Sequence, residues 1–223
     1  TARCCKEGIL PENCYCVRLY RTTYEGERLV NTTQVNYVDP LDRKQILEAD
    51  QELRHQMNII TDFLRKYVPG YEHCTIKTGA STLGIRESRR FSGKYVMNIS
   101  DLREARRFPD VVVHKAQFVV DIHNPVGGGQ ANGIAEYVDA YDIPWRSLVP
   151  QKMENLILAG RCISGTHEAM ASYRVMAIAM AIGEAAGIGA ALAIDHDVTP
   201  ENLDVKYIQK ALMDKGAVLF DEK

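Results

Sequence analysis

The segment 154–187, ENLILAGRCISGTHEAMASYRVMAIAMAIGEAAG, constrains the fold of this 223-residue chain more than any other. A short apolar run, residues 155–160, leads into a polar segment with an arginine, a histidine and serines, and a long run of alanine, glycine and methionine follows. A continuous apolar run of this length is typical of a strand buried on both faces. Ligands bind where a helix follows such a strand in α/β folds. The segment therefore predicts an α/β fold with a binding site at this strand-to-helix corner.

The apolar residues 175–194 cover about the length that a bilayer requires. Glu184 interrupts them, and most of the others are alanine and glycine, which contribute little transfer free energy. We therefore predict no membrane span but a buried helix that starts near Ser172. Gly183 and Gly187 lie one turn apart, and this spacing suits close packing against either a sheet or a flat cofactor.

The rest of the chain predicts a mixed set of elements. Residues 15–38 are rich in tyrosine, valine and threonine and have a turn at Glu25-Gly26, so we predict a hairpin. Helical spacing of apolar residues predicts a long helix over residues 41–67. A strand over residues 118–125 and an amphipathic helix that starts at Pro200 complete the prediction.

Charge and cysteine content exclude some classes of function. The formal net charge is -2 and no long basic run is present, so we expect no nucleic-acid partner. Six cysteines without a regular spacing fit a reducing cytoplasm better than a disulfide scaffold. Cys4, Cys5, Cys14 and Cys16 lack the CxxC spacing of zinc and iron–sulfur sites, so we expect no metal.

Two groups of polar residues are candidates for binding or catalysis. RESRR places Arg86, Arg89 and Arg90 around one glutamate, and these side chains can bind a carboxylate or phosphate with forked hydrogen bonds. A surface cluster of ion pairs is the alternative. His123 lies at a strand end before a loop, where active-site groups are common, although a structural histidine fits equally.

A longer pattern carries a resemblance to a known family. The order NLxxAGRCISxTHEAxxSxRVMxxxxAxGxAAGxxAAL, with LGIRESRRFSGKY, VDIHNP and YDIPWRSLVP before it, resembles the carboxyl-terminal part of FAD-dependent oxidoreductases with a glutathione-reductase-type flavin domain. The resemblance covers residues 35–217. It implies FAD as the cofactor, and some relatives near this family carry iron–sulfur clusters.

The resemblance also implies roles for single residues. Around the flavin it places the strand end, the start of the following helix and two arginines: Ala159, Gly160, Arg161, Ser172, Arg174, Val175, Arg86 and Arg90. The helix N-terminus would face the flavin edge where negative charge gathers on reduction. As catalytic or substrate-binding groups we expect His167, His123 and Arg89. Of these, His167 is a proton donor or a hydrogen-bond partner of the substrate.

The resemblance predicts two regions and leaves two functions open. Residues 1–150 form a substrate region with a mixed sheet and the long helix, and residues 151–223 form the last strand and helix of a Rossmann-like FAD domain. The family's amino-terminal GxGxxG unit is absent from this sequence, so we expect it in the same polypeptide or on a partner. The first function is hydride transfer between flavin and a small organic substrate. The second is a catalytically silent assembly module that completes a partner's flavin site, and self-association into a homo-oligomer is left open.

Overall fold

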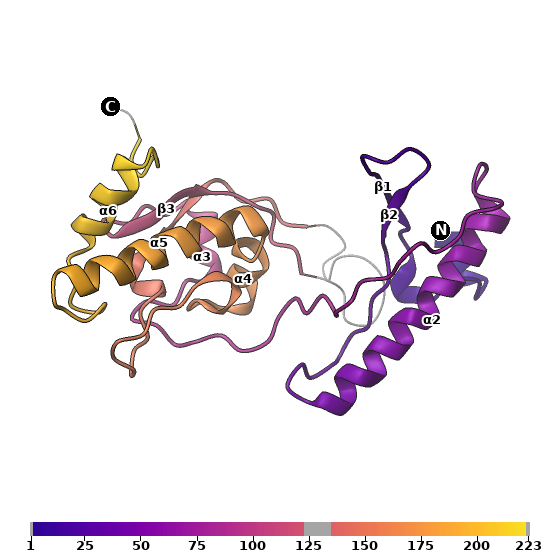
Figure 1. Ribbon diagram of the computed structural model, residues 1–223, viewed down its shortest axis with the longest axis horizontal. Helices are drawn as coiled ribbons and strands as arrows, with labels where there is room; N and C mark the ends of the chain where they lie inside the picture. Colours follow the sequence, from indigo (N-terminus) through magenta and orange to yellow (C-terminus); the bar gives the residue numbers. More distant parts are fainter. Residues whose placement is uncertain (1, 123–134, 222–223) are drawn as a thin grey trace. The chain divides into compact units, whose positions relative to one another are not determined.

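The computed structural model describes residues 2–122 and 135–221, which divide into two compact units (Figure 1). Within the described residues, unit 1 comprises residues 2–88, and unit 2 comprises residues 89–122 with residues 135–221. Both helices and small antiparallel sheets are present, so the fold is mixed α/β, as expected for part of a flavin-binding protein. The boundary near residue 150 between a substrate region and a flavin domain stays a prediction.

Unit 1 consists of a hairpin and one long helix. Its elements are α1 (Ala2–Lys6), η1 (Glu12–Cys14), β1 (Arg18–Arg21), β2 (Arg28–Asn31) and α2 (Arg43–Tyr67). The antiparallel pairing of β1 with β2 and the positive φ of 78° at Gly26 confirm the predicted hairpin. The long helix is also confirmed, and it begins where the Asp42 side chain accepts hydrogen bonds from the backbone N–H groups of Lys44 and Gln45.

A buried amide joins α2 to the segment after the hairpin. Gln56 is 1% exposed, and its Oε1 accepts hydrogen bonds from the Gln34 backbone N–H at 2.9 Å and from Cys14 Sγ at 3.3 Å. Its Nε2 donates to the Gln34 carbonyl at 3.1 Å and to Glu52 at 2.9 Å. Because every polar atom of this side chain has a partner, its burial is not penalised.

Burial of Cys14 predicts an unreactive thiol. Desolvation raises the pKa of Cys14 to about 11, so at pH 8 only about one thiol in a thousand is the reactive thiolate. We expect iodoacetamide to label Cys14 more slowly than the partly exposed Cys16 and Cys162, as measured by mass spectrometry of the peptides. Equal labelling rates in the folded protein would contradict the buried placement, whereas equal rates in denaturant are expected.

Unit 2 packs helices against a short sheet. Its elements are α3 (Ile99–Arg103), β3 (Val111–Ala116), β4 (Tyr141–Pro144), η2 (Trp145–Ser147), η3 (Gly160–Cys162), α4 (His167–Tyr173), α5 (Met176–Asp195) and α6 (Val205–Asp214). The strands β3 and β4 pair antiparallel, and α5 and α6 lie against β3 (Figure 1). Val111, Ile143, Ile182 and Ile208 form part of the buried core between these layers.

Four predictions for unit 2 were wrong in detail. The helix expected from Ser172 is two helices, because Val175 is extended (φ -71°, ψ 152°) and α5 begins at Met176. Residues 155–160 form no strand, since among the described residues the backbone-to-backbone bond that links them to another segment is a single one, from Leu158 N–H to the Leu148 carbonyl. The strand expected at 118–125 is reduced, within the described residues, to one bridge at Val120. The last helix starts after Asp204, not at Pro200.

The helix α5 was predicted to be buried, but only one of its faces is. By length and composition alone it is the one helix in the described part of the chain that is apolar enough to cross a membrane, and 33% of its apolar window is buried. One such helix is weak evidence, because core helices of soluble proteins meet the same criteria.

Candidate functional site

The polar segment between the two apolar runs forms a tightly held corner, which we call the corner segment (residues 160–166). Four successive carbonyl groups of this segment accept hydrogen bonds from other parts of unit 2. The donors are Phe91 N–H to Cys162 (3.1 Å), Tyr173 Oη to Ile163 (3.2 Å), Met97 N–H to Ser164 (3.2 Å) and Arg90 Nε to Gly165 (3.0 Å). The backbone of the corner segment is therefore fixed in one conformation before any ligand binds.

Gly160, the first residue of the corner segment, has open space beside its Cα atom. Its φ of 72° lies in the left-handed region that favours glycine, and an added Cβ would meet no atom within 4 Å. The preceding Ala159 is extended, and its carbonyl accepts a hydrogen bond from Cys162 Sγ at 3.3 Å. Arg161, the next residue after Gly160, is exposed and takes part in an interaction within the protein. The backbone at Gly160 can thus be approached closely by a ligand.

Tyr173 packs against the corner segment. The ring is fully buried, and a Cβ at Gly165 would lie 2.7 Å from its hydroxyl oxygen, so this glycine is required by packing. Burial raises the pKa of Tyr173, which keeps the phenol neutral and able to donate to the Ile163 carbonyl. Sequence reasoning missed this residue, although it stands between two predicted site residues, Ser172 and Arg174.

The helix α4 begins directly after the corner segment. Thr166 Oγ1 accepts a hydrogen bond from Ala169 N–H at 3.4 Å, and His167 is the exposed first residue of the helix. Hydrogen bonds from its own backbone N–H and from Thr166 lower the pKa of Glu168, so this carboxylate is charged beside His167. The structure therefore places His167 next to the corner segment on the solvent side.

Ser172 and Arg174 have partners within the protein. Ser172 is fully buried, and its Oγ donates to the Phe118 carbonyl at 2.6 Å and lies 2.8 Å from the Tyr141 hydroxyl. Arg174 forms an ion pair with Asp121 at 2.7 Å and also donates to the Asp121 carbonyl. Both side chains thus hold residues 118–121 at the junction of α4 and α5. Their contact with a cofactor stays a prediction.

One face of α5 is open, and its residues share small size or apolar character. This open face of α5 consists of Met176, Ala177, Met180, Gly183, Gly187, Ala190, Ala191 and Ile194, with Glu184 beside it. Met176 is 83% exposed and Ile194 is 80% exposed, and an added Cβ at Gly183 or Gly187 would meet nothing within 4 Å. The open face is therefore flat and solvated in its middle part.

The predicted arginine cluster is divided between the units. Arg90 lies at the corner segment, whereas Arg86 belongs to unit 1 and Arg89 is exposed at the start of unit 2. Roles for Arg86 and Arg89 in flavin or substrate binding stay predictions. His123 lies outside the described residues.

Two buried hydroxyl groups near the corner segment lack a protein partner. Ser147 Oγ and Ser164 Oγ are inaccessible and have no hydrogen bond among the described residues, although Ser164 N–H donates to the Ser147 carbonyl at 3.0 Å. Such atoms are available to a bound polar group or an ordered water. Nowhere in residues 2–122 and 135–221 are three or more His, Cys, Asp or Glu side chains placed to hold a metal ion.

The comparisons with known proteins give one match. The model of a family described as FAD dependent oxidoreductase matches residues 3–212. No curated protein and no solved structure matches the chain. The matched range includes the corner segment, α4, α5 and most of α6.

Proposed function

The chain belongs to the family of FAD dependent oxidoreductases, and we propose that it serves hydride transfer between an organic substrate and the flavin. FAD is the cofactor of the family, and when bound it supplies the redox chemistry while the protein supplies binding, orientation and charge. The observation that carries the proposal is the corner segment, in which the protein holds the four carbonyl groups of residues 162–165 and Gly160 is open. The glutathione-reductase-type form of the flavin domain is part of this proposal.

The residues at the corner segment fit a flavin. Gly160 has open space where a side chain would stand, and Gly183 and Gly187 leave the middle of α5 flat. The Ser164 hydroxyl is a buried polar atom without a hydrogen-bond partner among the described residues. These features allow a flat, polar group to approach the backbone. Ala159, Gly160 and Arg161 would then hold the cofactor at the end of the apolar run.

The start of α5 is suited to negative charge. Val175 cannot cap this 20-residue helix with its side chain, so the first N–H groups receive no hydrogen-bond acceptor from the N-cap side chain. These groups and the positive end of the helix dipole would stabilise the charge that gathers on a reduced flavin. Ser172 and Arg174 would act by fixing this helix start. Arg174 is not proposed to transfer a proton, because a guanidinium keeps its proton.

Substrate contacts are assigned to the exposed polar side chains. His167 lies beside the corner segment and would donate a proton or a hydrogen bond to the substrate. Arg89 is exposed at the start of the segment that pairs with the corner, and it would bind an anionic group of the substrate. His123 is proposed as a second proton-transferring group.

We further propose that the site needs an amino-terminal unit with the glycine fingerprint, in the same polypeptide or on a partner. The open face of α5 supports this, because a mostly apolar face with two bare glycines suits close packing against another element. The alternative function, an assembly module without catalysis of its own, rests on the same face. A chain that turns yellow with FAD alone would exclude that alternative.

A paired substitution tests the corner segment as the flavin site. Gly160→Val places a side chain at a φ of 72°, and Gly70→Val places one at a φ of 87° in unit 1, each with nothing within 4 Å. The backbone strain of the two variants is similar, about 1–2 kcal/mol. We expect Gly160→Val to weaken flavin binding at least about tenfold, while Gly70→Val binds flavin as the parent chain does.

The measurement is flavin absorbance per chain after equilibration with FAD, with circular dichroism as the control for folding. If the chain alone is colourless, the same pair is compared in the presence of the upstream polypeptide. Equal flavin content in the two variants would remove residue 160 from the site.

A further inference from the structure

The hairpin β1–β2 of unit 1 exposes large apolar side chains to solvent. Tyr20 and Leu29 stand opposite each other and are 47% and 61% exposed, and Val30 is 41% exposed. An isolated two-stranded hairpin is marginally stable in water. We propose that the outer edge of β1 binds an extended, acidic segment of a partner protein, which joins the hairpin as a third strand.

The backbone at this edge is open. Arg18 N–H donates a hydrogen bond to Thr32 Oγ1 at 3.2 Å and therefore points toward β2. Because backbone groups alternate along an antiparallel strand, the N–H and C=O groups of Leu19 and Arg21 point to the opposite edge. Within the part of the chain that the structure describes, those N–H groups donate no backbone hydrogen bond to a residue outside the hairpin. An added strand would find donors and acceptors there.

The charges of the strands point to an acidic partner. The charged residues of β1 and β2 are all arginines: Arg18, Arg21 and Arg28. Arg21 stands directly opposite Arg28, an arrangement that is unfavourable without an anion nearby. None of the three forms an ion pair with a carboxylate in residues 2–122 and 135–221. Carboxylates on an added strand would supply the missing counter-charges.

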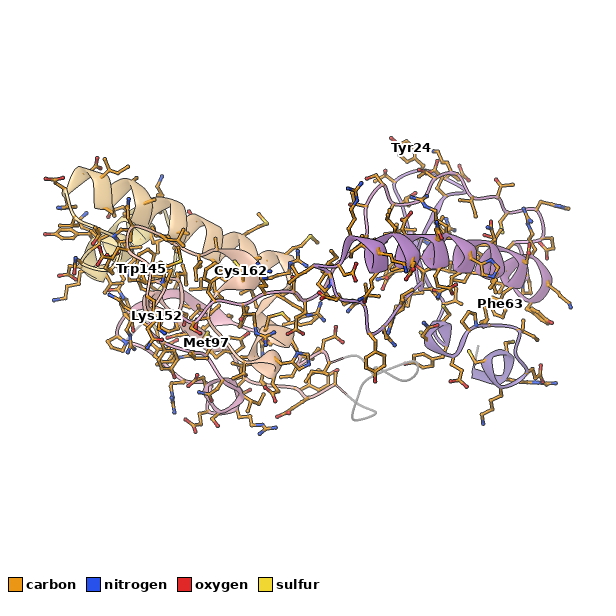
Figure 2. The ribbon with its side chains drawn as sticks, turned by 90° about the horizontal axis from the view of Figure 1, so that it is seen from below. Tyr24, Phe63, Met97, Trp145, Lys152 and Cys162 are labelled. Atoms are coloured by element: carbon orange, nitrogen blue, oxygen red, sulfur yellow. The ribbon has the colours of Figure 1, made fainter. Side chains whose placement is uncertain are left out.

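The hairpin is already ordered at its tip. Tyr24 lies at the far end of the loop (Figure 2), Lys77 Nζ is 5.3 Å from the centre of its ring, and Lys77 also pairs with Glu27. Thr22 Oγ1 accepts a hydrogen bond from Tyr24 N–H at 3.2 Å. An edge that is held in place before binding loses less entropy when a strand is added.

Two other occupants are less favourable. A second copy that paired through β1 would bring arginines of one copy next to arginines of the other, which like-charge repulsion opposes. A nucleic acid would satisfy the arginines, but it would leave the open N–H and C=O groups of the strand edge unused. Both occupants remain distinguishable by experiment.

The test uses the full chain and fluorescent peptides in which valine alternates with glutamate, glutamine or lysine. Fluorescence anisotropy is expected to show saturable binding of the glutamate peptide, at least about tenfold tighter than that of the glutamine peptide and weakened by about 0.5 M salt. The double substitution Arg18→Glu and Arg21→Glu should abolish this preference and create binding of the lysine peptide. Arg43→Glu, an exposed charge reversal on α2, serves as the matched control and should leave binding unchanged.

The proposal is overturned by any of three results. The first is no saturable binding of the glutamate peptide to the folded chain. The second is an oligonucleotide of equal charge that binds as tightly as the peptide. The third is a dimer in sedimentation that a single reversal, Arg18→Glu or Arg21→Glu, strengthens, because an Arg–Glu contact between copies would then replace an Arg–Arg contact and would assign the edge to a second copy. Circular dichroism of each variant shows that a loss of binding is not a loss of folding.

Discussion

Gly189→Ala is expected to destabilise unit 2 by about 2–3 kcal/mol. A Cβ at this position would lie 2.4 Å from Cη2 and 2.9 Å from Cζ3 of Trp145, and the indole is 4% exposed. A buried indole cannot move aside without disturbing the core around β3. The change is measured by urea unfolding, with the fluorescence of Trp145, the only tryptophan of the chain, as the signal.

The matched control lies two residues earlier in the same helix. Gly187→Ala adds a Cβ that meets nothing within 4 Å, so it should stabilise the chain by up to about 1 kcal/mol through helix propensity. The two alanines therefore have opposite effects on the free energy of unfolding. Equal effects would show that α5 does not pack on Trp145 as described.

Asp142→Asn is expected to cost about 3 kcal/mol, because an amide cannot accept all the hydrogen bonds that the buried carboxylate accepts. The carboxylate is 2% exposed, and its oxygens lie 2.8 Å from His114 Nδ1 and 3.1 Å from Arg107 Nη1. Its oxygens also accept hydrogen bonds from the backbone N–H groups of Phe108 and Lys115. An amide at this position must turn its NH₂ group toward one of these donors. The loss of stability is measured by thermal and urea unfolding.

The control for this substitution is an exposed ion pair. Asp214 lies beside Lys210 on α6, and its side chain is 62% exposed. Asp214→Asn should change the free energy of unfolding by less than about 0.5 kcal/mol, because solvent screens the pair. A cost for Asp142→Asn as small as this would contradict the buried network.

Local patterns predicted the parts of the fold that depend on near neighbours. The hairpin and α2 carry their own turn, cap and spacing, so the sequence alone indicated them. The apolar run 155–160 was predicted to be a strand because its residues are apolar, but a strand also needs a partner strand, and in the described part of the chain only Leu158 forms a backbone-to-backbone bond from this run to another segment. The break between α4 and α5 depends on Ser172 and Arg174, which bond to a distant segment.

One part of the candidate site was predicted from the sequence, and the other part was not. The corner segment was identified from its residues and from the family resemblance, and the match to FAD dependent oxidoreductases confirms the family and the cofactor. The supports of the corner were not predictable. Met97 and Tyr173 reach it only through the tertiary fold, and nothing in their local sequence indicates which carbonyl they would bond.

The two faces of α5 place different constraints on the residues that can occupy them. Toward Trp145 the helix is restricted to side chains that the core of unit 2 accepts, with glycine required at 189. On the open face, substitutions such as alanine at Gly187 leave the fold of this chain intact. The proposed packing of another element on the open face would restrict its residues as well, through binding and not through the fold of this chain. A comparison of substitution rates on the two faces thus separates selection for folding from selection for assembly.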